Sequence, residues 1–304
     1  MISRFLITLG VLSLLAACDE TGGPPSVTSP PPPSISGQSE ALSTYYSQVQ
    51  ADLLARGLLR TDGGGPDTPF TPDMLARNFE RIAFYDEYTA GAGLERASGQ
   101  AGQLRRWQSP VRVSMSFGSS VSEPQRATDQ EALTAYLPRL ARTTGHPIRA
   151  ASGKANFHVL VMGADDTTEL ADHLDRVLPT ASAKTRALFT NPPRHIYCFV
   201  VTQASEQAPN AYTSAVALIR AEHPDLLRKS CIQEEIAQGL GLTNDSPQAR
   251  PSIFNDDEEF ALLTTHDEML LSMLFDPRLS IGMTVEEARP VVHILAREQT
   301  NQNF

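Results

Sequence analysis

The sequence has little of several features that would assign a function directly. Acidic residues outnumber basic ones, 35 against 25, and the net charge of −10 argues against a nucleic-acid partner and against electrostatic attachment to anionic lipid. The chain contains no phosphate-binding glycine loop, no dinucleotide fingerprint and no G-x-S-x-G elbow, so nucleotide chemistry and a serine hydrolase have no support. After its first residues it has no long apolar run that would give a second membrane attachment.

The one strongly apolar stretch lies at the N-terminus and has the layout of an export signal. Arg4 precedes the apolar run, and the letters LAAC end at Cys18. The run is too short for a spanning helix, so residues 1–17 are expected to be a signal peptide. The ending resembles a bacterial lipobox, in which the cysteine becomes the first mature residue and carries acyl chains. We therefore expect lipidation at Cys18; a simple cleaved signal with an incidental cysteine is the alternative.

A segment rich in proline, serine and glycine follows the expected anchor. Residues 18–39 cannot bury apolar surface and their prolines stiffen the chain, so they predict an extended tether. The expected location is the bacterial cell envelope, with the folded part facing the periplasm. Asp19 resembles an inner-membrane retention signal of enteric bacteria, which favours the inner membrane and leaves the choice of membrane open. Residues 40–304 remain for a single folded domain.

Two cysteines remain for that domain, Cys198 and Cys231. An even pair in an oxidising compartment favours one disulfide, with two buried free thiols as the alternative.

The folded part mixes helical and strand patterns. Residues 40–90 indicate a helical lead-in, in which Thr71 and Pro72 form the N-cap and first turn of a helix. Residues 105–245 combine a sheet with a central helix, and residues 246–304 add C-terminal helices. This arrangement predicts an α+β fold, a mixed sheet packed with helices. The expected strands are 109–117, 156–163, 194–203 and 211–222. The expected helices in the same region are 122–143, 167–178 and 224–240. For the C-terminal helices, which start near Thr264 or Thr265 and at Thr284, capping boxes are expected at Thr265 with Glu268 and at Thr284 with Glu287.

The candidate chemistry lies in the stretch EEIAQGLGLTND, which starts at Glu234. Glu234 and Gln238 are four residues apart and share the helix face opposite an apolar stripe formed by Ile232, Ile236 and Leu240. By spacing alone this face is the solvated side of an amphipathic helix.

In its context the stretch resembles the active-site helix of the metzincin branch of the zincins, which carries the pattern HExxHxxG. Glu234, Glu235 and Gln238 fall on the places of the first ligand, the general base and the second ligand. The third-ligand place falls on Asn244, beside Asp245. The order of elements also matches that plan, which implies a zincin-like sheet that brings the two cysteines near one another.

The chain is also similar to a bacterial lipoprotein family, the domain of unknown function 2927, over most of residues 40–298. The most specific parts are EEIAQGLGLTND, SIFNDDEE and HDEMLL. This resemblance implies a fold more than a reaction, because no activity comes with the family.

The chain lacks the histidines that a zinc site of this plan needs. Zinc is held by imidazoles, whereas Glu234, Gln238 and Asn244 offer only oxygen atoms, which suit hard divalent cations better. Glu235 keeps the place of the catalytic base, yet without a metal-bound water it has little to deprotonate. We therefore expect no zinc and no other cofactor, and leave a hard divalent cation open.

Two functional hypotheses follow from these residues. The first is a non-catalytic envelope lipoprotein that uses the degenerate site to bind a peptide, a protein or a wall component. The rival is an active metal-dependent hydrolase, a peptidase with oxygen ligands, some of them from Asp245 or His266. Further binding candidates are Asn255 and Asp256, in an acidic turn, and His266, which we expect at the surface or at a helix cap.

Overall fold

The computed structural model describes residues 35–301 except positions 90, 94, 96 and 256. The expected signal peptide at 1–17, the expected lipidation site Cys18, most of the expected tether and the candidate Asp256 lie outside the described residues.

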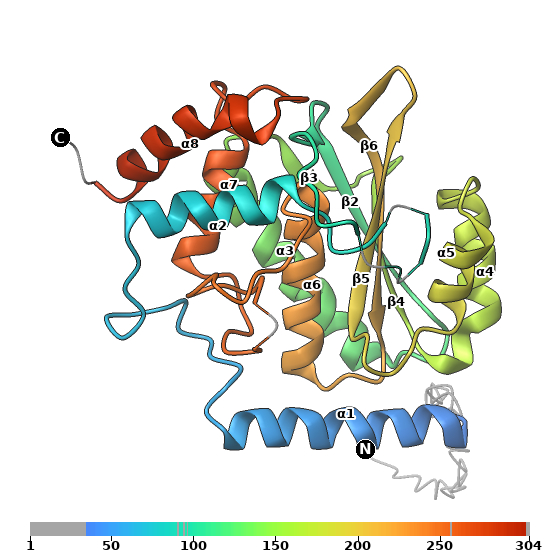
Figure 1. The fold of residues 1–304 in the computed structure, drawn as a ribbon. Coiled ribbons are helices and arrows are strands. Elements are labelled where there is room, and N and C mark those ends of the chain that lie inside the picture. Colours follow the sequence, from blue (N-terminus) through green and yellow to red (C-terminus); the bar gives the residue numbers. More distant parts are fainter. Residues whose placement is uncertain (1–34, 90, 94, 96, 256, 302–304) are drawn as a thin grey trace, which may run out of the picture. The chain divides into compact units, whose positions relative to one another are not determined.

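A mixed β-sheet lies at the centre of the fold. Its strands run in the order β1 (Arg106–Trp107), β6 (Ala208–Arg220), β4 (Phe157–Met162), β2 (Val111–Phe117) and β3 (Ile148–Ala150), all parallel to their neighbours (Figure 1). A further strand, β5 (Cys198–Ser205), pairs antiparallel with β6. The predicted α+β class with a mixed sheet is confirmed.

Helices cover both faces of the sheet. On one face lie α3 (Glu123–Thr144) and α6 (Asp225–Leu240), and on the other lie α4 (Thr167–Val177) and α5 (Ala183–Thr190) (Figure 1). Alternate residues of β4 serve the two sides, because side chains of a strand point to opposite faces. Phe157, Val159 and Val161 join the core shared with α3 and α6, whereas Leu160 and Met162 join the core under α4 and α5.

Further helices pack outside this layer. They are α2 (Pro72–Phe84), α7 (Thr265–Leu274) and α8 (Val285–Gln299), with a short 3-10 turn, η1 (Ala164–Asp166), before α4. None of the described helices has the length and apolar character needed to cross a membrane.

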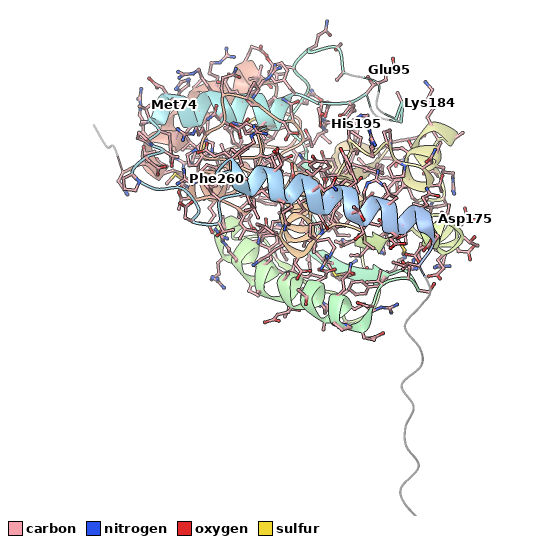
Figure 2. The ribbon with its side chains drawn as sticks, turned by 90° about the horizontal axis from the view of Figure 1, so that it is seen from below. Met74, Glu95, Asp175, Lys184, His195 and Phe260 are labelled. Atoms are coloured by element: carbon pink, nitrogen blue, oxygen red, sulfur yellow. A yellow bond between two sulfur atoms is a disulfide. The ribbon has the colours of Figure 1, made fainter. Side chains whose placement is uncertain are left out.

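Helix α1 (Gly37–Ala55) begins inside the range expected for the tether and crosses one end of the fold (Figure 2). The Ser39 hydroxyl donates to the carboxylate of Glu222 at 3.1 Å, and the buried Tyr46 hydroxyl donates to the carbonyl of Arg194 at 2.9 Å. The chain that emerges from the N-terminal segment is therefore held against the carboxyl ends of β4 and β6.

The three predicted helix starts are confirmed, and two of the three predicted caps are correct. The Thr71 hydroxyl accepts from the backbone of Met74, and Thr284 forms its capping box with Glu287. The box expected at Thr265 with Glu268 is wrong by one residue, since Thr264 is the N-cap and Asp267 its partner. The carboxylate of Glu268 is instead drawn into an ion pair with Arg139 at 2.7 Å.

Every expected strand and helix of the sheet region is present, with small shifts at the ends. Strands β1 and β3 and helix α5 were not predicted from the sequence. The predicted disulfide is confirmed: Cys198 on β5 is bonded to Cys231 on α6, with the Cα atoms 5.8 Å apart.

Candidate functional site

Helix α6 packs against the sheet with a glycine, Gly239, at the contact. A Cβ atom on Gly239 would come within 2.6 Å of the ring of Phe157 and 3.2 Å of Val200. The indole nitrogen of Trp107 donates to the Gly239 carbonyl at 2.8 Å, which holds the same turn from β1. The helix then ends at Gly241, whose φ of 137° suits glycine and whose place leaves no room for a Cβ beside the Arg105 carbonyl.

Glu235 is on the face of α6 that meets β5. Cys231 and Gly239, one turn before and one turn after it, contact Cys198 and Val200 of that strand. Consequently Glu235 is only 3% exposed, and its Oε2 atom has no hydrogen-bond partner. Burial raises the pKa of the Glu235 carboxyl well above its ordinary value, which favours the neutral acid.

Glu234 lies beside it and is partly buried. One carboxylate oxygen of Glu234, one of Glu235 and the sulfur of Cys198 all lie within 4.8 Å of one another. Burial also raises the pKa of Glu234, and the negative charges of Asp245 and Glu235 add to the effect. Two carboxyls this close in a desolvated place do not both ionise readily, so they form a coupled acid pair.

Gln238 and Asp245 complete this group. The Gln238 side-chain amide donates to Asp245 Oδ1 at 3.1 Å, which fixes the amide one turn beyond Glu234. Four sequence-predicted candidates, Glu234, Glu235, Gln238 and Asp245, are thus brought together around the last turns of α6. The face expected to be solvated is largely covered.

The other candidates are committed to neighbouring segments. The Asn244 amide donates to the Arg81 carbonyl at 3.1 Å, and the Asn255 amide donates to the Ala249 carbonyl at 2.9 Å. His266 is 0% exposed, which corrects the expected surface position; it hydrogen-bonds the Asn78 side chain at 3.1 Å and packs edge-on against Phe70. These contacts hold loops and helices together.

The segment after α2 supplies a residue that no sequence pattern singled out. Glu87 is close enough to the acid pair to raise the pKa values of both Glu234 and Glu235. Further along, Glu95 pairs with Lys184 of α5 at 3.7 Å, and the Gly91 carbonyl accepts from Ser182 at 2.7 Å (Figure 2). This segment therefore extends from the acid pair to the helices on the opposite face of the sheet.

A positive group lies near the end of α6. Arg105, whose carbonyl faces Gly241, forms an ion pair with Asp86, and its Nε atom is buried without a hydrogen-bond partner. The buried Tyr212 hydroxyl lies close by, and burial raises its pKa. A cation, a carboxylate and a phenol thus lie together beside the C-terminal end of α6.

The available donors do not form a zinc site. Among the described residues, Cys198, Glu234 and Glu235 are the only group of three with metal-ligand atoms in reach of one another. Cys198 is in a disulfide and offers no thiolate, so two carboxylates remain. Zinc sites are built mainly from imidazole and thiolate, whereas an oxygen pair suits a hard cation or a shared proton.

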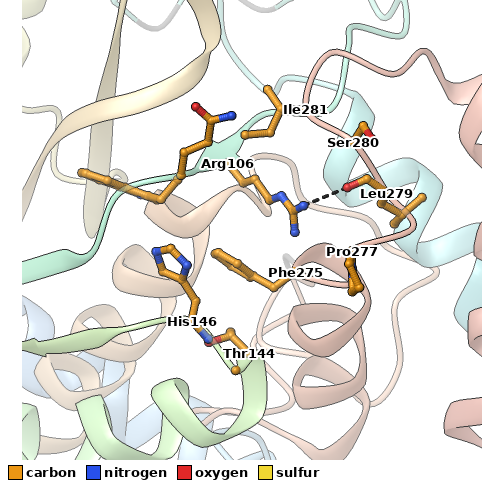
Figure 3. A pocket seen from close by; sticks show the side chains of 11 residues that line it. Arg106, Thr144, His146, Phe275, Pro277, Leu279, Ser280 and Ile281 are labelled. Atoms are coloured by element: carbon orange, nitrogen blue, oxygen red, sulfur yellow. Dashed lines mark hydrogen bonds between the residues drawn. The ribbon is translucent and has the colours of Figure 1, made fainter.

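A hollow of about 560 Å³ lies elsewhere, between β1, the end of α3 and the connection from α7 to α8 (Figure 3). Two of its polar side chains, Arg106 and His146, are already engaged with the backbone. Arg106 donates to the carbonyls of Leu274 and Leu279 at 2.7 and 2.8 Å, and the His146 Nε2 atom bonds the Ser109 carbonyl at 2.9 Å. Burial lowers the pKa of His146, so the ring is a neutral donor in this contact. The bonds of Arg106 and His146 hold β1 and the end of α3 to neighbouring segments, which is a structural role.

A model of a family of proteins of unknown function, DUF2927, matches residues 72–294, from the start of α2 into α8. The chain belongs to the DUF2927 family. The DUF2927 match contains the acid pair, Gln238, Asp245 and the disulfide, while α1 lies before it. Comparison with curated proteins gives no match, and neither does comparison with solved structures.

Proposed function

We propose that this DUF2927 protein is a cell-envelope lipoprotein whose zincin-like domain has lost catalysis and binds an extended peptide segment of another envelope component. The observation that carries the proposal is the buried acid pair. Glu234 and Glu235 occupy the places of a zinc ligand and a general base in the metzincin pattern, and Glu235 keeps a buried oxygen atom without a partner. A neutral carboxyl donates and accepts hydrogen bonds but cannot replace two imidazoles around zinc.

The order of elements supports the zincin-like interpretation. A strand and helix, β2 and α3, precede further strands, and a long helix with a glycine stop leads to a turn and a closing helix. In that turn the Ser252 hydroxyl and the Ile253 backbone both donate to the buried Asp267, at 2.5 and 3.0 Å. Phe254, at the place of the methionine in the metzincin turn, is fully buried.

The strand beside the acid pair supports peptide binding. Within the described chain, β5 is paired on one edge only, with β6, and its residues are all partly exposed. An unpaired strand edge offers backbone donors and acceptors to an added strand, which is a common mode of peptide recognition. A peptide added there would lie between β5 and the segment that includes Glu87 and Glu95, within reach of the acid pair.

The first test is chemical. Protein purified without chelator should contain no stoichiometric zinc by elemental analysis and should cleave none of a broad set of peptide substrates. The rival hydrolase would be established by a tightly bound metal ion together with peptidase activity that Glu235→Gln abolishes.

The second test measures binding. Labelled synthetic peptides from envelope proteins should bind the full chain in fluorescence anisotropy. Glu235→Gln should retain binding because the amide still donates a hydrogen bond, whereas Glu235→Leu should weaken it by roughly tenfold. Glu131→Leu, at an exposed position of α3, is the matched control. Equal affinity for Glu235→Leu and the unchanged protein would contradict a role for the acid pair.

A further inference from the structure

A second hollow, of about 710 Å³, lies on the face of the sheet that α4 and α5 cover only in part. These helices are short and pack over the carboxyl halves of the strands, on Leu160 and Leu218. His158 lies two residues before Leu160 on β4, and Ser214 lies four residues before Leu218 on β6, so both are on the same face of the sheet and line the hollow. The uncovered half of this sheet face is therefore polar. The volume of the hollow above it suits a small molecule.

The charged residues that line the hollow are all basic. Arg112, Lys154 and Arg176 lie on its wall, and the lining contains no carboxylate. Within the part of the chain that the structure describes, none of the three forms an ion pair. In a protein with a net charge of −10, a concave surface of one positive sign is a local exception that would concentrate anions.

One of these cations is held in place by the backbone. The Nε atom of Arg112 donates to the Lys154 carbonyl at 2.8 Å, and its Nη1 atom donates to the Pro110 carbonyl at 3.3 Å. Both contacts are with neutral oxygens, so they orient the guanidinium without cancelling its charge. Arg149 is the register partner of Arg112 on β3 and adds a further positive charge on the same side of the sheet.

A neutral donor adds directionality to the hollow. The Nδ1 atom of His158 lies 3.1 Å from the Ser114 hydroxyl. Burial, aided by His173, lowers the pKa of His158, so the ring is neutral near pH 7. When Nδ1 accepts the Ser114 hydrogen, Nε2 carries the ring proton and can donate it. The side chains of Asn156 and Thr213 are already hydrogen-bonded to the backbone, and Val177 gives the hollow an apolar side.

We propose that this hollow binds a small ligand through a phosphate group. Three cations with no carboxylate among them match a doubly charged oxyanion, and a planar guanidinium suits its geometry. The remaining volume, on the Val177 side, would hold the organic part of a phosphate monoester or of a lipid headgroup. The proposal rests on different residues from those of the peptide-binding function and stands independently of it.

The test is calorimetric titration of the full chain with inorganic phosphate and with glycerol phosphate, at constant ionic strength. We expect saturable binding of one phosphate per chain, weakened by roughly tenfold in each of Arg112→Gln, Lys154→Gln and Arg176→Gln. Arg77→Gln removes an exposed cation from α2 and should leave the affinity unchanged. Circular dichroism of each variant checks that the fold is retained.

A vesicle arm separates the two sources of the phosphate group. The non-lipidated Cys18→Ala chain is sedimented with phosphatidylglycerol vesicles. Sedimentation that is lost when Arg176→Gln is added would assign a lipid headgroup. Binding of glycerol phosphate without sedimentation would assign a soluble ester. Absence of saturable binding to inorganic phosphate, glycerol phosphate and vesicles alike would overturn the proposal. So would an equal loss of affinity in Arg77→Gln, since that outcome would mean unspecific attraction by net positive charge.

Discussion

At the scale of single residues, the unusual feature is a carboxyl group that folding places where it cannot easily ionise. Glu235 has one oxygen without a hydrogen-bond partner, and it lies next to Glu234, whose pKa is raised by the same burial. An unsatisfied buried polar group typically costs about 1–3 kcal/mol of stability, so its retention needs a reason outside folding. Binding of a ligand that satisfies the free oxygen is such a reason.

The pH dependence of stability follows from the raised pKa of Glu235. The folded protein holds this proton more tightly than the unfolded chain, in which a glutamate ionises near pH 4.3. The stabilisation is therefore complete below about pH 4 and is lost as the pH rises towards the folded-state pKa. Glu235→Gln removes this loss, so the variant should exceed the unchanged protein in stability at pH 8, and by less as the pH falls towards 4.

Denaturant unfolding at a series of pH values between 4 and 8 measures this difference. Glu131→Gln, at an exposed position of α3, serves as the matched control. A constant gap between Glu235→Gln and the unchanged protein across the series would mean that the carboxyl is ionised in the folded state.

At the scale of elements, the site depends on how α6 is fastened to β5. The Cys198–Cys231 disulfide joins the two near the start of the helix, and Gly239 lets them approach at its end. Glu235 lies between these two fastenings on the same helix face. The burial of its carboxyl is thus a consequence of the contact between α6 and β5.

The disulfide should make a large contribution to stability. It closes a loop with a sequence separation of 33, and the chain-entropy estimate for such a loop is roughly 3–4 kcal/mol. The double variant Cys198→Ser with Cys231→Ser should lower the free energy of unfolding by about that amount in urea. Thiol titration of the denatured, unreduced protein should find neither cysteine free, and equal urea midpoints before and after reduction would contradict the estimate.

The close approach of α6 to the sheet at Gly239 should also contribute to stability, because it leaves no room for a larger side chain. Gly239→Ala would place a methyl group within 2.6 Å of the buried Phe157 ring, and overpacking of this kind costs about 1–3 kcal/mol. Gly37→Ala is a suitable control, since no atom lies within 4 Å of the added Cβ at that position. Thermal unfolding should show a clearly lowered melting temperature for Gly239→Ala and not for Gly37→Ala. Equal melting temperatures of the two variants would mean that α6 can shift away from the sheet.

Features set by local sequence patterns could be predicted, whereas contacts between distant segments could not. Long apolar runs and caps gave the main strands and helices, including the start of α2 at Thr71, because local patterns determine them. Strands β1 and β3 contain too few residues to show any period. Helical spacing placed Glu234 and Gln238 together, yet it could not show that neighbouring elements cover this face. The proximity of Glu87 and the burial of His266 depend on segments that are distant in the chain.

At the scale of the whole molecule, the proposed envelope lipoprotein can be considered from the place where its chain enters the folded domain. The described chain enters the fold at α1, which is attached at Ser39 and Tyr46 to the end of the sheet at the carboxyl ends of β4 and β6. The hollow proposed to bind phosphate lies towards the amino ends of β2 and β4, where Arg112 and His158 stand. The attachment to the N-terminal segment and the proposed phosphate site are therefore at opposite ends of the sheet.

Lipidation at Cys18 remains a prediction, and fractionation of cells tests it directly. The net negative charge of the protein disfavours electrostatic attachment to anionic lipid. Together with the LAAC ending, this makes acyl chains on Cys18 the expected attachment. Cys18→Ala should move the protein from the membrane fraction to the soluble fraction, and mass spectrometry of the unchanged protein should find the acyl groups on its first residue. Asp19→Ser is the matched control, because it should alter the choice between inner and outer membrane while the protein stays lipidated. A Cys18→Ala protein that has lost its signal segment and still sediments with membranes would show that another part of the chain provides the attachment.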